Sequence, residues 1–236
     1  MNDLVLLSAH GAALWTDLES ALATRAKLHI PSLDDYDTLS AAAEAVLAAA
    51  PPRFALAGLC VGGYVALEIV TQAPLRVSRL ALLHTSARAD SEADAQRRAR
   101  RIASLRAKTG YPSPEYVREA VPWMIAPAGW RDPGLIARVE ALLMATSVAA
   151  GLRQQMAMAS RRDRRDDLAG LHLPALVATG AVDRIAPPAL SREMAERLPH
   201  ARLEILADCG HLSPLEQARR LGALMADWLD ADQAAC

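Results

Sequence analysis

Six short apolar runs alternate with longer alanine-rich stretches along this chain. The runs cover residues 4–9, 26–30, 53–59, 79–84, 174–179 and 202–206. Short runs rich in Leu and Val are typical of strands buried on both faces, whereas the stretches between them have helical spacing. Strands that alternate with helices pair in parallel, because each helix returns the chain to the same end of the sheet. The alternation therefore predicts an α/β fold with a mostly parallel sheet of about six strands and helices on both faces.

The longest interval between two of these runs, residues 86–173, is helical in pattern throughout and contains no convincing strand. Within it, segments 91–108, 114–126 and 133–160 predict three or more helices, and Gly and Pro residues mark the turns between them. We therefore expect residues 1–85 and 174–236 to form a core domain, and residues 86–173 to form a helical cap inserted into it. The helices of the core are predicted at 15–24, 38–50, 61–72, 189–198 and 215–230.

Composition and charge exclude several other classes of protein. Apolar residues make up 52% of the 236 residues and charged residues 22%, which suits a packed domain and not a disordered chain. A net charge of -1 gives no general attraction to nucleic acid or anionic lipid, so neither is an expected partner. No run approaches the roughly 18 apolar residues of a membrane helix. The first strand also lacks the basic region and cleavage site of a signal peptide.

The three cysteines bear on the compartment. Cys60, Cys209 and Cys236 are an odd number without the spacing of a disulfide framework. Such usage suits a reducing environment, so we expect a cytoplasmic protein in which at least one thiol is functional.

The third strand leads into a helix through Gly58-Leu59-Cys60-Val61-Gly62-Gly63. A nucleophile on such a tight strand-to-helix turn needs glycine neighbours, and the helix N-terminus favours a thiolate at that position. A buried cysteine at an ordinary glycine-rich turn is the alternative, and this motif alone does not decide between the two.

Two later strand ends carry the partners that a nucleophile requires. Asp183 follows the fifth strand, and His211 follows the sixth. In a parallel sheet the ends of these strands meet at the carboxyl edge, where open α/β sheets bind their ligands. Residues suited to be nucleophile, acid and base thus occur in that order at three strand ends, which favours a catalytic reading of Cys60.

With Ser8-Ala9-His10-Gly11 after the first strand, these motifs resemble the α/β-hydrolase fold superfamily over nearly the whole chain. The resemblance implies a catalytic triad of Cys60, Asp183 and His211, and an oxyanion hole formed by the backbone N–H groups of Val61 and Ala12. Most members carry serine at the position of Cys60, on the tight turn between the third strand and the following helix, which is called the nucleophile elbow. Cysteine there is a departure shared with dienelactone hydrolases and polyhydroxyalkanoate synthases, which the rest of the chain does not resemble.

A cysteine nucleophile favours thioester, lactone and activated ester chemistry, because a thiolate is both a good nucleophile and a good leaving group. We therefore expect a hydrolase that acts through a cysteinyl acyl-enzyme and needs no cofactor. An acyltransferase that uses the same acyl-enzyme is one alternative, and a non-catalytic small-molecule-binding protein of this fold is another. The sequence does not choose between water and a second acceptor, and it indicates no oligomeric state.

Three further residues are candidates for the substrate pocket: Trp123, Met124 and His84. Trp123 and Met124 are among the large apolar side chains of the cap, which favour an apolar acyl substrate. His84 ends the fourth strand and is expected to line the pocket or to be structural. No metal site is expected, since Cys209 near His211 lacks the spacing of zinc ligands.

A basic run at residues 161–165 contains four arginines and one aspartate, and two more aspartates follow it. Arginine clusters can bind phosphate, but the interspersed acidic residues indicate a solvated, salt-bridged helix end instead.

Overall fold

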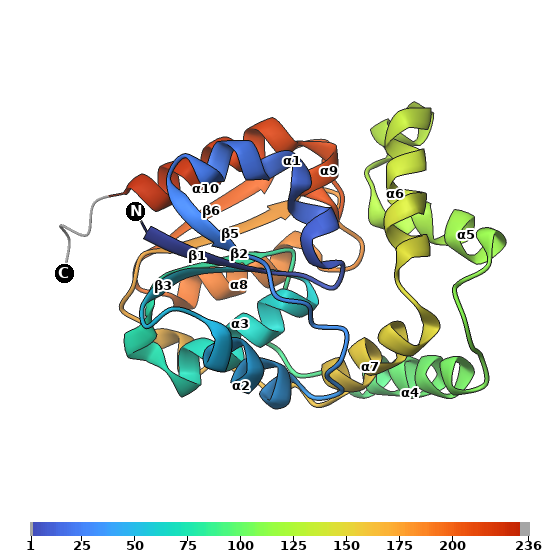
Figure 1. Ribbon diagram of the computed structural model, residues 1–236, viewed down its shortest axis with the longest axis horizontal. Coiled ribbons are helices and arrows are strands. Elements are labelled where there is room, and N and C mark those ends of the chain that lie inside the picture. The colour runs from blue at the N-terminus through green and yellow to red at the C-terminus, as the bar shows by residue number, and fades with distance from the viewer. Residues whose placement is uncertain (1, 232–236) are drawn as a thin grey trace.

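The computed structural model describes residues 2–231 and contains a six-stranded parallel sheet between two layers of helices (Figure 1). The strands are β1 Asn2–Leu7, β2 Ala26–His29, β3 Phe54–Leu59, β4 Val77–Leu83, β5 Ala175–Gly180 and β6 Ala201–Leu206. Their order across the sheet is β2-β1-β3-β4-β5-β6, and every pairing is parallel. The predicted fold class is confirmed, and the strand boundaries differ only slightly from those expected.

Helices cover both faces of this sheet. They are α1 Gly11–Ala23, α2 Leu39–Ala49, α3 Val61–Gln72, α8 Pro188–Arg197, α9 Ser213–Glu216 and α10 Ala218–Asp230, with short 3-10 turns η1 Pro74–Arg76 and η3 Asp167–Gly170. Helices α1 and α10 lie on one face, and α2, α3 and α8 lie on the other (Figure 1). Leu4 and Leu6 of β1 belong to the first core cluster, whereas Val5 and Leu7 belong to the second. Because successive strand side chains point to opposite faces, each strand is apolar on both sides.

Two core helices depart from the sequence prediction. Helix α1 begins at Gly11 and not near Trp15, because the small residues before Leu14 extend the helix without showing apolar periodicity. The segment expected to form one helix at 215–230 forms α9 and α10, since the backbone of Gln217 leaves the helical conformation between them.

Between β4 and β5 the described chain contains no strand, and four α-helices precede η3. These are α4 Glu92–Arg106, α5 Pro114–Met124, α6 Pro133–Ala145 and α7 Val148–Ala159, with η2 Pro127–Arg131, and they stand beside the sheet domain (Figure 1). Each α-helix begins at a residue whose side chain accepts a backbone N–H of the first turn: Ser91, Ser113, Asp132 and Ser147. The placement of the cap boundaries at residues 86 and 173 stays a prediction.

The segment 133–160 forms two helices, which agrees with the prediction of three or more helices between β4 and β5. Thr146 adopts an extended conformation and Ser147 caps a new helix, so that α6 and α7 meet at an angle of 85°. Within residues 2–231, no single helix is long and apolar enough to cross a membrane, and α6 with α7 meets that criterion only as a bent pair.

The strand order places two of the predicted motifs together. Strand β1 lies between β2 and β3, so the chain winds outward in opposite directions from this point. Open α/β sheets bind ligands at the carboxyl edge beside such a switch point. The segment that follows β1 and the turn that follows β3 both lie at this edge, and the second of these carries Cys60.

Candidate active site

Cys60 is the one residue between β3 and α3, and its backbone is strained. Its φ of 54° lies in the left-handed region, which non-glycine residues rarely adopt. The surrounding structure fixes this conformation through two hydrogen bonds. The backbone N–H of Cys60 donates to the carbonyl of Leu83 at 3.0 Å, and the Thr85 hydroxyl donates to the carbonyl of Cys60, also at 3.0 Å. Strain held in this way is typical of functional positions.

Close packing around the turn explains its glycines. A Cβ added at Gly58 would overlap the backbone of Gly62, and a Cβ added at Gly62 would overlap the carbonyl of Leu7. Cys60 is therefore held at the N-terminus of α3, where backbone N–H groups of the first turn lack helical partners. Their positive potential lies at the Cys60 side chain, and the N–H of Val61 belongs to the same first turn.

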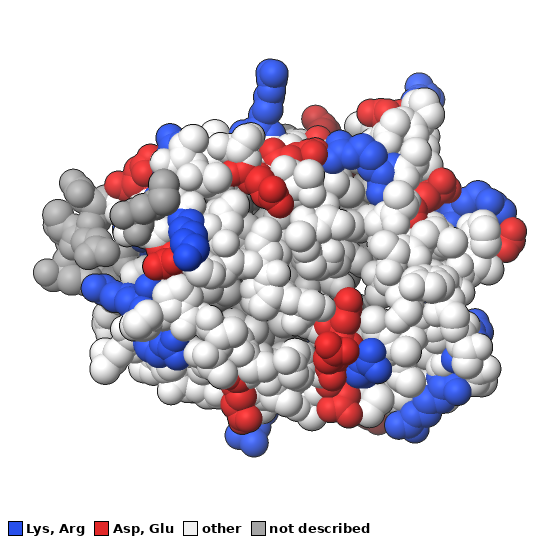
Figure 2. All heavy atoms as spheres, in the orientation of Figure 1, with Lys and Arg blue, Asp and Glu red and all other residues white. Residues whose placement is uncertain are grey.

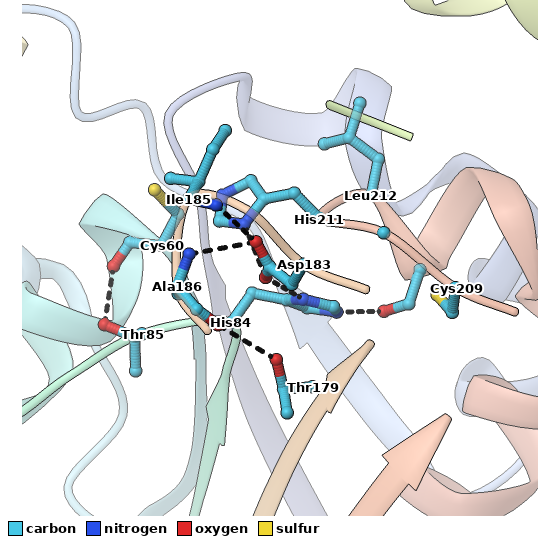
Figure 3. A network of polar contacts seen from close by, with 12 residues as sticks. Cys60, His84, Thr85, Thr179, Asp183, Ile185, Ala186, Cys209, His211 and Leu212 are labelled. Atoms are coloured by element: carbon cyan, nitrogen blue, oxygen red, sulfur yellow. Dashed lines mark hydrogen bonds and ion pairs between the residues drawn. The ribbon is translucent and has the colours of Figure 1, made fainter. Parts of the chain in front are cut away.

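The loops after β5 and β6 bring Asp183 and His211 into contact (Figure 3). Oδ2 of Asp183 accepts a hydrogen bond from Nδ1 of His211 at 2.8 Å. Oδ1 accepts the backbone N–H groups of Ile185 and Ala186 at 2.8 and 2.9 Å. Burial alone would raise the pKa of this carboxyl group, but the hydrogen bonds from His211 and His84 outweigh it and hold the pKa well below its usual range. Asp183 is therefore a buried carboxylate at neutral pH.

His211 links this carboxylate to the thiol. Burial lowers the pKa of its imidazole, but the charge of Cys60 and hydrogen bonds with Asp183 and Cys60 outweigh burial and raise the pKa to about 10. The backbone N–H of His211 donates to the carbonyl of Met124 at 2.9 Å, which ties the histidine loop to the cap. The His211 ring is thus held between the Asp183 carboxylate and the Cys60 side chain.

His84 lies behind Asp183 and does not line the cavity, which corrects the expectation that it contacts the substrate. Its Nδ1 donates to the same Oδ2 of Asp183 at 2.8 Å, and its Nε2 accepts the Ser213 hydroxyl at 2.7 Å. The side chain is fully buried, and burial lowers its pKa. His84 is therefore a neutral second donor to the acid, turned toward it from the end of β4 by a φ of 49°.

His84, Asp183 and His211 also offer three ligand atoms within 4.8 Å of one another. In the structure two ring N–H groups donate to one carboxylate oxygen, and a metal ion would have to replace both hydrogen bonds. The cluster is best described as a hydrogen-bonded network (Figure 3).

A cavity of about 840 Å³ opens between Cys60 and the cap, a size typical of small-molecule sites. Its apolar lining comes from the core and the cap and includes Leu14, Leu59, Val61, Met124, Leu143 and Leu212. Charged and phenolic side chains also line it, including Tyr64, Arg98, Arg101, Lys108, Tyr116 and Arg161. The cavity thus combines an apolar surface with a basic one.

The two cap residues predicted to bind substrate lie in different environments. Met124 lines the cavity, whereas the Trp123 side chain is outside it and 58% exposed. The guanidinium of Arg184 lies over the Trp123 ring at 5.9 Å. Trp123 is therefore a surface residue of α5, and its predicted contact with substrate is corrected.

The second predicted oxyanion donor is also misplaced. Ala12 is exposed in the first turn of α1 and does not line the cavity, because that helix begins at Gly11. Ala9 and His10 line the cavity instead. Burial and the charge of His211 lower the pKa of His10 to about 4, so this ring is neutral beside the site.

Sequence analysis missed the residue that holds the histidine loop in place. The carboxylate of Glu216 accepts the backbone N–H groups of Gly210 at 2.9 Å, Leu212 at 3.1 Å and Ala126 at 2.7 Å. It also lies beside the buried Cys209 thiol, whose pKa is raised by burial and by this carboxylate. Cys209 is consequently a structural residue, and Cys236 lies outside the described residues.

A parallel sheet with cysteine, acid and histidine at three strand ends beneath a helical cap defines an α/β hydrolase. The chain belongs to the alpha/beta hydrolase family, whose sequence model matches residues 4–224.

Similarity to individual proteins is more distant. Pimeloyl-[acyl-carrier protein] methyl ester esterase from Neisseria meningitidis is 26% identical over 206 residues, covering 85% of this chain and 64% of that enzyme. Proline iminopeptidase from Lactobacillus delbrueckii is 39% identical over 64 residues, covering 27% of this chain and 21% of that enzyme. Both matches cover less than two thirds of the relative's length.

Solved structures extend the likeness to almost the whole chain. An esterase from Thermogutta terrifontis has a TM-score of 0.85 at 24% identity, covering 98% of this chain and 90% of that one. The enol-lactonase from Burkholderia xenovorans has a TM-score of 0.81 at 22% identity, covering 98% and 92%. At these identities the likeness establishes the fold.

Proposed function

We propose that the protein hydrolyses carboxylic esters, thioesters or lactones through an acyl-enzyme on Cys60. The observation that carries this proposal is the placement of Cys60 at the N-terminus of α3, facing a His211 that Asp183 orients. The similarity to a methyl ester esterase supports the same class of bond.

In the first half of the reaction, the Cys60 thiolate attacks the substrate carbonyl carbon and forms a carbon–sulfur bond. The negative charge moves to the carbonyl oxygen, where the N–H of Val61 stabilises it. When the tetrahedral intermediate collapses, the bond to the leaving group breaks and the His211 imidazolium supplies a proton to that group. The products are a thioester on Cys60 and a free alcohol or thiol.

In the second half, neutral His211 removes a proton from water as the water oxygen attacks the Cys60 thioester. The tetrahedral intermediate expels the thiolate, which restores the pair of Cys60 thiolate and His211 imidazolium. Asp183 stays ionised throughout and keeps the imidazole in the tautomer whose Nε2 faces the reaction. This cycle consumes one water molecule and requires no cofactor.

The working thiol also suggests where the protein acts. Cys60 and Cys209 are both free, and a nucleophilic cysteine must remain reduced. We therefore propose a reducing compartment such as the cytoplasm, and an acyl substrate whose hydrocarbon part packs against the apolar lining around Met124 and Leu143.

Thiol reactivity tests the proposal before any substrate is known. At neutral pH, iodoacetamide should alkylate Cys60 much faster than Cys209, because the first thiol faces His211 and the second is buried beside Glu216. Peptide mapping measures both rates in one sample. Alkylated protein and the Cys60→Ala variant should both be inactive toward a panel of esters, thioesters and lactones on which the parent is active. Turnover by either one would contradict the proposal.

A further inference from the structure

Two arginines in the wall of the cavity share a single carboxylate. Nε and one Nη of Arg98 bind the two oxygens of Asp90 at 2.6 and 3.0 Å, and an Nη of Arg161 binds one of those oxygens at 2.5 Å. All three side chains are largely buried, with exposed fractions of 14%, 11% and 9% for Arg98, Arg161 and Asp90. Two positive charges therefore face one negative charge, and one positive charge is not compensated within this group.

Arg161 also keeps an unused donor. Its Nε is buried and has no hydrogen-bond partner among residues 2–231. Its guanidinium lies over the ring of Tyr64 at 4.5 Å, in a position set by aromatic contact as well as by Asp90. A buried guanidinium with spare hydrogen-bonding capacity is costly unless an anionic partner completes it.

The arginine pair lies within electrostatic reach of the nucleophile. Tyr64, at the start of α3, has its pKa raised to about 12 by burial and by the charge of Cys60, while Arg161 and Arg98 oppose the rise. The same cavity is lined by Cys60, Tyr64 and both arginines. A molecule bound to Cys60 can therefore extend to the arginines without leaving the cavity.

Two other arginines of the basic run at residues 161–165 form the salt bridges that the sequence predicted. Arg164 pairs with Glu68 and Asp167, and Arg165 pairs with Asp163 and Glu193. The prediction of a salt-bridged helix end is therefore confirmed for these two residues, whereas Arg161 departs from it by lining the cavity.

We propose that Arg161, supported by Arg98, binds a carboxylate or phosphate-like group of the substrate, so that the substrate is an acyl compound with an anionic end. The guanidinium fork suits both oxyanions. The apolar side chains of the same cavity accommodate a hydrocarbon segment, and the ester or thioester carbonyl lies at Cys60. The inference rests on the proposed function of Cys60 and specifies its substrate class.

Matched substrates test this inference. Thioesters of succinic, glutaric and adipic acid each keep one free carboxylate, and those of butanoic, pentanoic and hexanoic acid are neutral counterparts of equal length. A phosphonobutanoyl thioester distinguishes a phosphate-like group from a carboxylate. For at least one charged compound, kcat/KM should exceed that of its neutral counterpart by about tenfold or more, the range expected for a charge-assisted contact.

The variant Arg161→Gln should reduce this ratio of charged to neutral kcat/KM by about tenfold, through KM and not kcat. Asp90 keeps its two bonds from Arg98 in this variant, which favours retention of the fold. Basic side chains also occur on the outer face near α4, so a general charge effect needs its own control (Figure 2). Arg162→Gln removes the same charge from an exposed neighbour outside the cavity, and it should leave the ratio as in the parent.

Protection of Cys60 gives a readout that does not depend on turnover. Glutarate should slow alkylation of Cys60 by iodoacetamide in the parent and in Arg162→Gln, and about tenfold more glutarate should be needed in Arg161→Gln. Equal kcat/KM for charged and neutral thioesters in the parent would overturn the anionic substrate, and so would equal protection by glutarate in the parent and in Arg161→Gln. Turnover of the neutral thioesters would still uphold the proposed hydrolase. Protection without turnover of any thioester would instead uphold the anion site and contradict the proposed function.

Discussion

The carboxyl edge of the sheet and the cap wall opposite it meet at the same cavity, but they are built differently. At the sheet edge, each oxygen of the Asp183 carboxylate accepts two hydrogen bonds, and the side chain is fully buried. In α4 of the cap, Leu105 is the one fully buried residue, and the arginines Arg98 and Arg101 line the cavity. One side is a closed polar network, whereas the other retains an uncompensated charge.

The difference suggests a division of labour between the two regions. A fully satisfied network fixes the positions of reacting groups, which governs the chemical step. A charged wall with spare donors distinguishes between ligands, which governs binding. Changes at the sheet edge should therefore lower kcat for all substrates, whereas changes in the cap should alter KM for particular ones.

The largest effect short of removing the nucleophile is expected for Asp183→Asn. The amide cannot accept hydrogen bonds at both of its positions, so His211 loses its orientation and the partner that stabilises its charge. By analogy with serine triads, kcat should fall on the order of 10⁴-fold, and by less if the thiolate–imidazolium pair persists. Steady-state kinetics should show the same loss for charged and neutral substrates. Asp163→Asn, which removes a carboxylate outside the cavity, should leave kcat unchanged. A loss of kcat confined to charged substrates would contradict the assignment of the chemical step to the sheet edge.

A smaller effect is expected for Cys60→Ser, which should keep the fold and change the preference between thioesters and oxygen esters. A serine hydroxyl requires His211 to remove its proton during attack, whereas a thiol loses its proton far more readily. The ratio of kcat/KM for a thioester to that for the matched oxygen ester should fall by roughly an order of magnitude. Cys209→Ala should keep the parent ratio, since that thiol is buried away from the cavity. A serine variant faster on every substrate would indicate that serine is the better nucleophile for this site.

Ser213→Ala tests the outer part of the network. It removes the hydroxyl that donates to Nε2 of His84 and leaves a buried acceptor unpaired. We expect the free energy of unfolding to fall by about 1 kcal/mol and kcat to fall several-fold with KM unchanged. Urea denaturation and steady-state kinetics measure the two effects. The control is Ser191→Ala, because the buried Ser191 hydroxyl has no partner among the described residues. Equal effects in both variants would remove the special role of Ser213.

The smallest perturbation is a change of pH. The pKa of His211 is raised from its ordinary value near 6.5 to about 10. Its contribution to stability is therefore fully present below about pH 6.5 and is lost as the pH rises through about 10. NMR titration should give a midpoint near 10 in the parent and a lower one in Cys60→Ala, which lacks the sulfur group that raises the pKa of His211. His10 provides a contrast in the same spectra, with an expected midpoint near 4. If the His211 midpoint is the same in both proteins, Cys60 does not raise the pKa of His211.

Features set by local sequence were predicted, and most of them lie at the carboxyl edge of the sheet. The boundaries of α3 and the elbow before it follow from local signals, namely an apolar run, flanking glycines and helical periodicity. Asp183 and His211 follow from their positions after strands, because a parallel sheet brings strand ends together. The number and order of these elements were therefore enough to indicate the site.

Contacts between residues far apart in the chain could not be predicted from local sequence signals. Arg161 sits among alternating charges, and its carboxylate partner Asp90 lies 71 positions earlier in the chain. His84 was noted at the end of its strand, but its contact with Asp183 depends on a positive φ that has no local sequence signature. Ala12 was misplaced because small residues conceal where α1 begins.

The central claim is that Cys60 carries the acyl group. The most direct measurement is intact mass followed by peptide mapping of protein quenched in acid during turnover of a glutaric or pentanoic acid thioester. The account predicts an added acyl mass on the peptide that contains Cys60, loss of that mass as free acid is released, and no adduct in Cys60→Ala. Continued turnover in Cys60→Ala, or an acyl group that forms on another residue at the rate of turnover, would contradict it.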